Sequence, residues 1–208
     1  MLTVGPVAEN CFFVRREGSD GVLIVDPGEE AERILAKLEE IGGRAEAILL
    51  THCHFDHIGA VTPVAEATGA PVYCPEIEVP ILEDIMAFVP WEGFGPFESY
   101  TPDEIVRGGE TLELAGLELD VVFTPGHSPG HVTYAVPGED ALFSGDVLFQ
   151  GSVGRVDLPG GDGPTLMMSI RKLLDAYPDE TTVYPGHMGT TTLGAERATN
   201  PFLAELAR

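Results

Sequence analysis

Four potential metal ligands lie within six consecutive residues, and this cluster constrains the chain more than any other feature of its sequence. It follows residues 47–50 (AILL), an apolar run that we interpret as a buried strand leading directly into THCHFDH. Alternate residues of an extended chain point to the same side, so His52 and His54 can bind one ion together. Asp56 and His57, at the turn that follows, can bind a second ion. Imidazole and carboxylate ligands suit zinc, iron and related metals.

Cys53 stands between the two histidines, and an extended chain would turn its side chain to the opposite side. We therefore interpret it as a buried core thiol and not as a ligand. Surface or helix-capping roles for the neighbouring histidines are the alternative. Such roles do not explain why four donors follow a buried strand so closely.

Three further donors follow apolar segments later in the chain. His127 lies in TPGHSPGH, Asp146 in FSGD and His187 in YPGH. Each would stand at the carboxyl end of a strand, in a Gly- or Pro-rich turn that can bend tightly around an ion. A single Gly-His or Gly-Asp pair is weak evidence, because such pairs are common in turns. Together with the first cluster, the three residues supply the donors that two ions need.

The rest of the sequence predicts an α/β fold. Short apolar segments bounded by Gly and Pro indicate strands, and apolar residues every three or four positions indicate helices. Facing sheets with helices outside are the natural layered arrangement for these elements. The predicted strands are residues 10–16, 21–25, 47–50, 71–73, 111–114, 117–123, 131–136, 141–144 and 181–184. The predicted helices are residues 29–41, 58–68, 164–176 and 193–207, the last of them broken at Pro201.

Residues 75–104 differ from the rest, because they are rich in Pro, Gly and aromatic residues and show no clean period. We interpret them as an insertion. Its aromatic residues either form a lid over a substrate or pack locally or across a subunit interface; they are Phe88, Trp91, Phe94, Phe97 and Tyr100. No shift in composition marks a domain boundary, so we expect a single domain over residues 1–208.

The formal charge of −23, from 11 Lys and Arg against 34 Asp and Glu, argues against a nucleic-acid or anionic-membrane partner. We interpret the acidity as a solvated surface. No apolar run approaches the roughly 20 residues that a membrane helix needs, and residues 1–16 lack the pattern of a signal peptide. Cys11, Cys53 and Cys74 show no paired spacing, which suits a reducing compartment. We expect a cytoplasmic location and leave open whether the chain forms a homo-oligomer.

These motifs resemble those of the metallo-β-lactamase superfamily. Residues 51–57 match its T-H-x-H-x-D-H signature, and the later donors match its remaining ligand positions in order, so that the resemblance spans nearly the whole chain. It implies an αββα sandwich of two mixed sheets flanked by helices, with the site along one edge. It also implies two divalent metal ions, for which zinc is our first choice and iron or manganese the alternatives. It assigns His52, His54 and His127 to the first metal, Asp56, His57 and His187 to the second, and Asp146 to a bridge between them.

The resemblance also implies a reaction. A hydroxide that bridges the metals attacks an electrophilic carbonyl, one metal polarises the carbonyl oxygen, and Asp56 orients the nucleophile as the catalytic residue. Residues 144–155 (SGDVLFQGSVGR) and the tail after His187 are similar to the short, single-domain type of glyoxalase II (hydroxyacylglutathione hydrolase). The implied substrate is a thioester such as S-D-lactoylglutathione. Full-length glyoxalase II carries a further C-terminal helical domain that contacts glutathione, and this sequence ends at Arg208, so the thiol carrier stays open.

Three polar residues outside the ligand set are candidates for supporting roles. His131 has no ligand position in the family pattern, and its place in PGHSPGH predicts a hydrogen bond that steadies the His127 loop. Asp26, in VDPG after a predicted strand, is either a turn residue or a carboxylate that orients a ligand histidine. Arg155 either anchors a substrate carboxylate or pairs with Asp157 and holds its loop.

Other functions stay open on the same residues. A persulfide dioxygenase has this fold but a single iron held by two histidines and an aspartate; residues 151–157 would suit it, whereas seven donors favour two metals. A lactonase or another ester-cleaving metallo-hydrolase would use the same ligands. The lack of a secretion signal disfavours a β-lactamase, and the acidic charge disfavours an RNA-processing nuclease. A metal-stabilised binding module is the non-enzymatic alternative, but structural zinc sites are usually closed and rich in cysteine.

Overall fold

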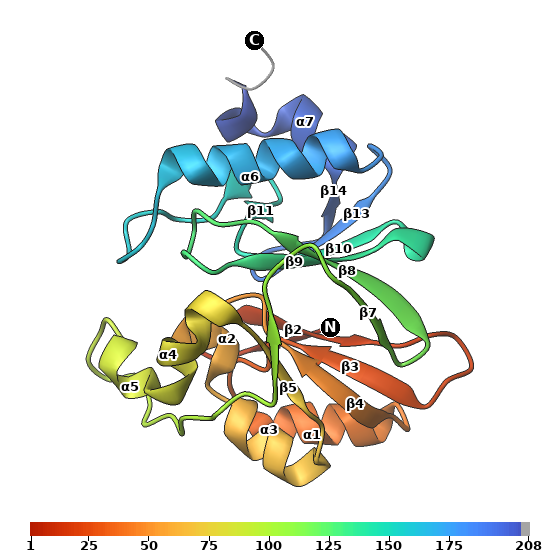
Figure 1. Ribbon diagram of the computed structural model, residues 1–208, viewed down its shortest axis with the longest axis vertical. Coiled ribbons are helices and arrows are strands. Elements are labelled where there is room, and N and C mark those ends of the chain that lie inside the picture. The colour runs from red at the N-terminus through yellow and green to blue at the C-terminus, as the bar shows by residue number, and fades with distance from the viewer. Residues whose placement is uncertain (205–208) are drawn as a thin grey trace. The chain divides into compact units, whose positions relative to one another are not determined.

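The structure, a computed structural model, describes residues 1–204 (Figure 1). The chain forms two compact units, one of Met1–Val106 with Glu113–Leu117, the other of Arg107–Leu112 with the residues from Glu118 onward. The first unit contains one six-stranded sheet, and the second contains another except for residues 113–114 of β7 and Leu117 of β8. Whether the units act together as one domain, as the sequence suggests, stays a prediction.

The first sheet has the strand order β1-β2-β3-β4-β5-β6. The strand β2 pairs antiparallel with β1 and β3, whereas the pairs from β3 to β6 are parallel, so the sheet is mixed. Its strands are β1 (Leu2–Val4), β2 (Glu9–Val14), β3 (Gly21–Val25), β4 (Arg44–Leu49), β5 (Val72–Pro75) and β6 (Glu104–Val106).

Two helices, α1 (Ala31–Glu40) and α3 (Val61–Thr68), lie side by side against this sheet (Figure 1). The residues that α1 buries, Ile34 and Leu38, are one helical turn apart and join the apolar core of the sheet. Burial of each such side chain contributes roughly 1.5–3 kcal/mol. Because β3 and β4 are parallel neighbours, the residues that follow them reach the same edge of the sheet.

The helix predicted over residues 58–68 is wrong at its beginning. A short helix α2 (Phe55–Ile58) comes first, and α3 starts only at Val61. The helical conformation is interrupted between them because the N–H of Ala60 donates to the carbonyl oxygen of Pro27, at 3.0 Å. Gly59 is required at this break, since a Cβ there would lie 2.5 Å from the carbonyl oxygen of Gly28.

Residues 75–104 contain helical turns that the sequence did not reveal. They are η1 (Glu76–Glu78), α4 (Val79–Glu83) and α5 (Ile85–Phe88). Each is about one turn long, which is too short for a helical period to show. Leu82 and Ile85 are the apolar residues with which α4 and α5 reach the core.

The second sheet has the order β14-β13-β10-β9-β8-β7. It too is mixed, because β10 pairs parallel with β13 but antiparallel with β9. Its strands are β7 (Thr111–Leu114), β8 (Leu117–Phe123), β9 (Val132–Val136), β10 (Ala141–Gly145), β13 (Thr182–Pro185) and β14 (Thr191–Thr192), and a separate hairpin is formed by β11 (Leu148–Phe149) and β12 (Ser152–Val153).

Helix α6 (Gly163–Ala176) packs on this sheet through Leu166, Ile170 and Leu173 (Figure 1). It begins at Asp162, whose carboxylate accepts a hydrogen bond from the N–H of Thr165 at 2.9 Å. This bond lowers the pKa of Asp162.

The C-terminal helical prediction is confirmed over α7 (Leu193–Thr199) and η3 (Pro201–Leu203), with the break at Pro201. Its last residues, 205–207, lie outside the described residues. The other predicted strands and long helices are confirmed to within a few residues. Within residues 1–204, no helix has the length and apolar character needed to cross a membrane.

Candidate metal centre

The donors of the first unit follow two adjacent parallel strands. Asp26 directly follows β3, His52 and His54 lie between β4 and α2, and Asp56 and His57 lie in α2. Ligand atoms of Asp26, His52 and His57 lie within 4.8 Å of one another, and all three residues are buried. The loops after these two neighbouring strands therefore meet at one end of the sheet.

The Asp26 carboxylate is the centre of this group. Its Oδ1 accepts a hydrogen bond from the N–H of Thr51 at 2.7 Å, and its Oδ2 accepts one from the Thr51 hydroxyl at 2.7 Å. Oδ2 also lies 3.0 Å from Nδ1 of His57, which donates to it, so Nε2 is the atom with which His57 would bind a metal. Of the two alternatives from the sequence, the contact with a candidate ligand histidine is present, and the backbone of Asp26 just after β3 is left-handed, with φ of 49°.

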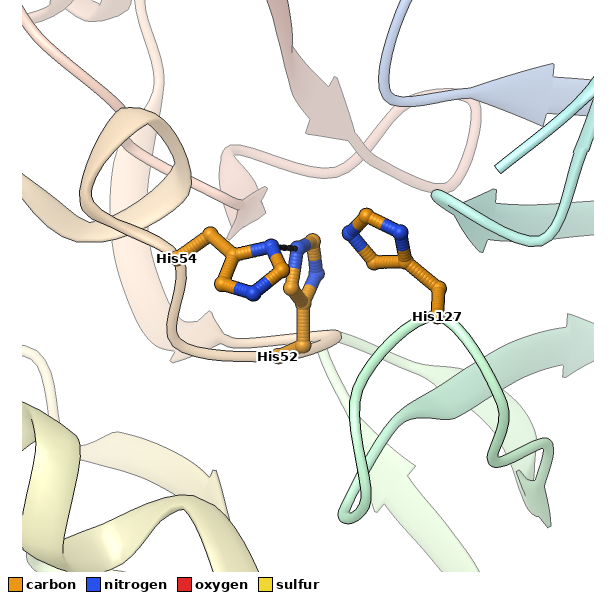
Figure 2. Close-up of side chains that lie close together, drawn as sticks. All are labelled: His52, His54 and His127. Carbon is orange, nitrogen blue, oxygen red and sulfur yellow. Dashed lines mark hydrogen bonds between the residues drawn. The ribbon is translucent and has the colours of Figure 1, made fainter. Parts of the chain in front are cut away.

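The orientation of His52 follows from the same network. The Thr51 hydroxyl uses its one hydrogen in the hydrogen bond to Asp26. It can therefore only accept in its 3.1 Å contact with Nδ1 of His52, so the imidazole N–H is the donor there. The lone pair of His52 is then on Nε2, which lies 3.1 Å from Nδ1 of His54 (Figure 2). As predicted, the two side chains point to the same side of the chain.

Cys53 is fully buried, as predicted. Its Sγ lies 3.6 Å from Sγ of Cys74, and its backbone N–H donates to a carboxylate oxygen of Glu78 at 3.2 Å. Burial, with a contribution from the neighbouring Cys74, raises the pKa of the Cys53 thiol well above its ordinary value. The side chain is a neutral core group, and Glu78 supports the backbone between the two histidines.

Phe55 connects the histidine loop with the aromatic insertion. Its ring centroid lies 4.8 Å from that of Phe94, 5.8 Å from that of Phe97 and 6.0 Å from that of Trp91. Local packing, one of the two alternatives for these aromatics, is therefore present. Trp91 and Phe88 stay exposed at their surface, and their role as a lid stays a prediction.

Two buried glutamates of the first unit escaped the sequence analysis. Glu9, on β2, is fully buried with Oε1 3.9 Å from Nδ1 of His57, and Glu78 is fully buried beside Cys53. Nothing in the sequence separates these two from the other acidic residues of a chain that has 34 Asp and Glu.

In the second unit, Asp146 lies between two histidines. It follows β10, while His187 follows the parallel neighbour β13 and His127 follows β8. Its Oδ2 lies 3.5 Å from Nε2 of His127 and 3.6 Å from Nε2 of His187. The three donors that the sequence picked out separately are therefore together, with the carboxylate oriented towards both rings.

His127 extends from the loop between β8 and β9 (Figure 2). Its Nδ1 lies 2.8 Å from the carbonyl oxygen of Arg155, so Nδ1 donates and Nε2 is the atom with which His127 would bind a metal. Histidines that bind metals usually donate their other ring N–H to a carboxylate or carbonyl group. His57 and His127 both have this arrangement, and the nitrogen and oxygen donors suit divalent metals such as zinc and iron. The residues present therefore fit a metal.

His131 has a different environment. Its Nε2 accepts the backbone N–H of Asp146 at 3.1 Å, and its Nδ1 lies 3.1 Å from the Thr124 hydroxyl. Both ring nitrogens contact protein groups, so the ring is a structural link and not a ligand. The predicted support of the His127 loop is present at Thr124, and the sequence missed the second partner, Asp146.

Arg155 forms a two-pronged ion pair with Asp157. Nε lies 2.7 Å from Oδ1, and a terminal nitrogen lies 2.8 Å from Oδ2. The hydrogen bonds from Arg155 lower the pKa of Asp157 to about 2. Of the two alternatives from the sequence the pairing is present, and the role as an anion anchor stays a prediction.

Comparisons with known proteins show the family of the chain. The sequence model of the Metallo-beta-lactamase superfamily matches residues 4–187. The "Probable metallo-hydrolase YqgX" of Bacillus subtilis is 41% identical, over 97% of this chain and 95% of that protein. The "Hydroxyacylglutathione hydrolase GloC" of Haemophilus influenzae is 34% identical, over 98% of this chain and 96% of that protein.

Two solved structures are similar over nearly their whole length. The BLEG-1 B3 metallo-beta-lactamase has a TM-score of 0.91 with 40% identity and covers 97% of each chain. TTHA1623, solved in a di-iron-bound form, has a TM-score of 0.84 with 44% identity and covers 97% of this chain and 98% of that one. The chain therefore belongs to the metallo-β-lactamase superfamily and has its α/β fold, with mixed sheets flanked by helices.

Proposed function

We propose that this chain is a metal-dependent hydrolase that cleaves a thioester such as S-D-lactoylglutathione. The observation that carries the proposal is the set of oriented histidines: Nδ1 of His52, His57 and His127 each donates to an oxygen of the protein. This arrangement directs Nε2 of each ring to a metal. The relatives named as a metallo-hydrolase and a hydroxyacylglutathione hydrolase support the reaction and the substrate class.

Seven donors would hold two divalent ions. Zinc is our first choice because His and carboxylate ligands suit it, and the di-iron form of TTHA1623 supports iron as the alternative. When bound, the ions would lower the pKa of a water molecule, which makes it a nucleophile, and polarise the carbonyl group. The donors are His52, His54 and His127 for one ion, Asp56, His57 and His187 for the other, and Asp146 for both.

The protein itself supplies orientation. Asp56 would accept a hydrogen bond from the attacking water and so direct its lone pair at the carbonyl carbon. Asp26 and Thr51 keep His57 and His52 in the tautomers described above. His131 holds the backbone of Asp146. Ligands that are fixed before the substrate binds need no reorganisation during the reaction, and this favours the transition state.

Hydrolysis of a β-lactam is the second candidate, favoured by the likeness to the BLEG-1 metallo-beta-lactamase. Both reactions begin with attack of water on a carbonyl carbon. They differ at the leaving group, because a thiolate departs without a proton, whereas the nitrogen of an opened lactam must gain one. The thioester reaction therefore needs no residue around the metals to protonate the leaving group.

A substrate panel tests the proposal. Purified protein is given S-D-lactoylglutathione, a simple thioester, a lactone, a β-lactam and, with oxygen, glutathione persulfide. We expect hydrolysis of the thioesters, its loss on treatment with a chelator, and its return with added zinc. Faster hydrolysis of the β-lactam would favour the second candidate, and oxygen consumption with the persulfide would replace both by a dioxygenase.

A further inference from the structure

We infer that Glu196 and Asn200 are positioning residues for the donors of the second unit, and that they act through the β11–β12 hairpin. The inference rests on the proposed role of His127, Asp146 and His187 as metal ligands. These two residues of the C-terminal segment contact no donor directly. They hold a short hairpin, and this hairpin together with the two residues after it, Gly154 and Arg155, contacts all three.

The hairpin is closely packed against Asp146. It begins two residues after this aspartate, and Gly154, just after the hairpin, returns to it. A Cβ built on Gly154 would lie 1.9 Å from the carbonyl oxygen of Asp146, so only glycine permits this approach. The N–H of Gly154 also donates to the carbonyl oxygen of Val147 at 3.2 Å. The position of the Asp146 backbone therefore depends on where the hairpin lies.

The same hairpin contacts both histidines. The ring of Phe149, on β11, lies edge-on to the ring of His187, with 5.9 Å between centroids and 88° between planes. Arg155, two residues after β12, presents the carbonyl oxygen that accepts the hydrogen bond from His127. A shift of the hairpin would therefore move the contacts of all three donors at once.

Glu196, in α7, anchors the turn of the hairpin. The residue is 2% exposed, and its carboxylate accepts hydrogen bonds from the N–H of Gly151 at 2.9 Å, the hydroxyl of Thr191 at 2.6 Å and the amide of Asn200 at 2.8 Å. The amide of Asn200 also donates to the carbonyl oxygen of Ser152 at 2.9 Å. Gly151 lies in the turn and Ser152 directly after it, so the N–H of the one is held by Glu196 of α7 and the carbonyl group of the other by Asn200, the residue that caps the end of α7.

The hairpin needs these anchors because it has little stability of its own. Each strand is two residues long, with two pairs of facing residues, Leu148 with Val153 and Phe149 with Ser152. Isolated two-stranded hairpins are marginal even when longer. Burial of a carboxylate is costly unless hydrogen bonds compensate it, and here three donors do so. Apolar residues already pack this end of the chain into the core, among them Leu193 and Leu203. In addition, the polar network fixes the position of the turn.

Glu196→Ala tests the inference, with Thr192→Ala as the matched control. The Thr192 hydroxyl caps α7 by accepting the N–H of Ala195 at 3.2 Å, so its loss destabilises the same helix without touching the hairpin. Glu196→Gln is the conservative rescue, because its amide oxygen can accept from Gly151 while its NH₂ donates to the Thr191 hydroxyl. Co²⁺ affinity is measured by competition with a chelator, together with the visible absorption of the Co²⁺-loaded protein and the melting temperature.

We expect Glu196→Ala to weaken Co²⁺ binding by about tenfold or more and to change the visible absorption. Thr192→Ala should lower the melting temperature and leave both metal readouts unchanged, and Glu196→Gln should restore them. Should Glu196→Ala fail to fold, Asn200→Ala removes the anchor at Ser152 and one of the three donors to Glu196, leaves the Glu196–Gly151 bond, and should weaken Co²⁺ binding by a smaller factor.

Unchanged Co²⁺ affinity in Glu196→Ala, or an equal loss in Thr192→Ala, would overturn the inference. His127→Ala separates it from the proposed function. If His127→Ala weakens Co²⁺ binding and Glu196→Ala does not, the inference alone fails. If His127→Ala also binds Co²⁺ normally, the proposed metal site itself fails.

Discussion

Oδ2 of Asp26 lies 3.0 Å from Nδ1 of His57, and the same oxygen accepts a hydrogen bond from the hydroxyl of Thr51. One buried carboxylate thus connects the end of β3 with the loop after β4 and with α2. It fixes the tautomer of His57 directly and that of His52 through Thr51.

Replacement of Asp26 by Asn should therefore weaken metal binding. Asparagine tolerates the positive φ of this position, so the change removes the charge and one acceptor and leaves the backbone conformation intact. We expect a fall in zinc affinity of about 10- to 100-fold, measured by competition with a chelator. Asp20→Asn, at an exposed position of the β2–β3 turn, is the control. Wild-type affinity in Asp26→Asn would show that His57 does not depend on this carboxylate.

His131→Ala should destabilise the second unit. It removes the acceptor of the Asp146 N–H in a buried site, and loss of such a partner costs roughly 1–3 kcal/mol. His131→Gln should recover part of the lost stability, because its amide oxygen can take the place of Nε2 as the acceptor. The free energy of unfolding in urea gives the comparison, and equal stability of the two variants would mean that the hydrogen bond contributes nothing.

The Cys53 thiol should be unreactive in the folded protein at pH 8, because burial raises its pKa and keeps the thiolate scarce. The folded state holds this proton more tightly than the unfolded state. The contribution of the protonated Cys53 thiol to the free energy of unfolding is therefore complete below the ordinary thiol pKa of about 8.5. It is lost as the pH rises above this value. Labelling with a thiol reagent, followed by mass spectrometry, checks this. Rapid modification of Cys53 before unfolding would be the contrary result.

Substitutions in the aromatic insertion should separate packing from substrate contact. Phe94 is half-buried against Phe55, so Phe94→Ala should cost on the order of 2 kcal/mol of stability. Trp91 is 42% exposed, and if it is part of a lid, Trp91→Ala should raise the KM severalfold with little change in melting temperature. An unchanged KM combined with a lower melting temperature would leave it only a packing role.

The ligand loops could be predicted from the sequence because histidine is uncommon and these histidines follow apolar strands. The spacing of His52 and His54 on an extended segment was sufficient to place them on one side. For Asp146 the same reasoning indicated only a Gly-Asp turn. This residue became a candidate ligand because it was considered together with the histidines. The strand pairing then brought it between His127 and His187.

The supporting groups could not be predicted, for physical reasons. The partner of His127 is the backbone carbonyl of Arg155, and a carbonyl carries no sequence signal. Glu9, Glu78 and Glu196 are buried by tertiary packing, which composition does not report. The turns between residues 76 and 88 are shorter than the period that would reveal them.

The most direct test of the central claim measures hydrolysis of S-D-lactoylglutathione and metal content on one purified sample. We predict thioester turnover with about two metal ions per chain, and loss of metal and turnover together in His54→Ala and in Asp146→Ala. Fully metal-loaded protein without thioester turnover would contradict the proposal, as would one iron per chain with oxygen consumed on glutathione persulfide.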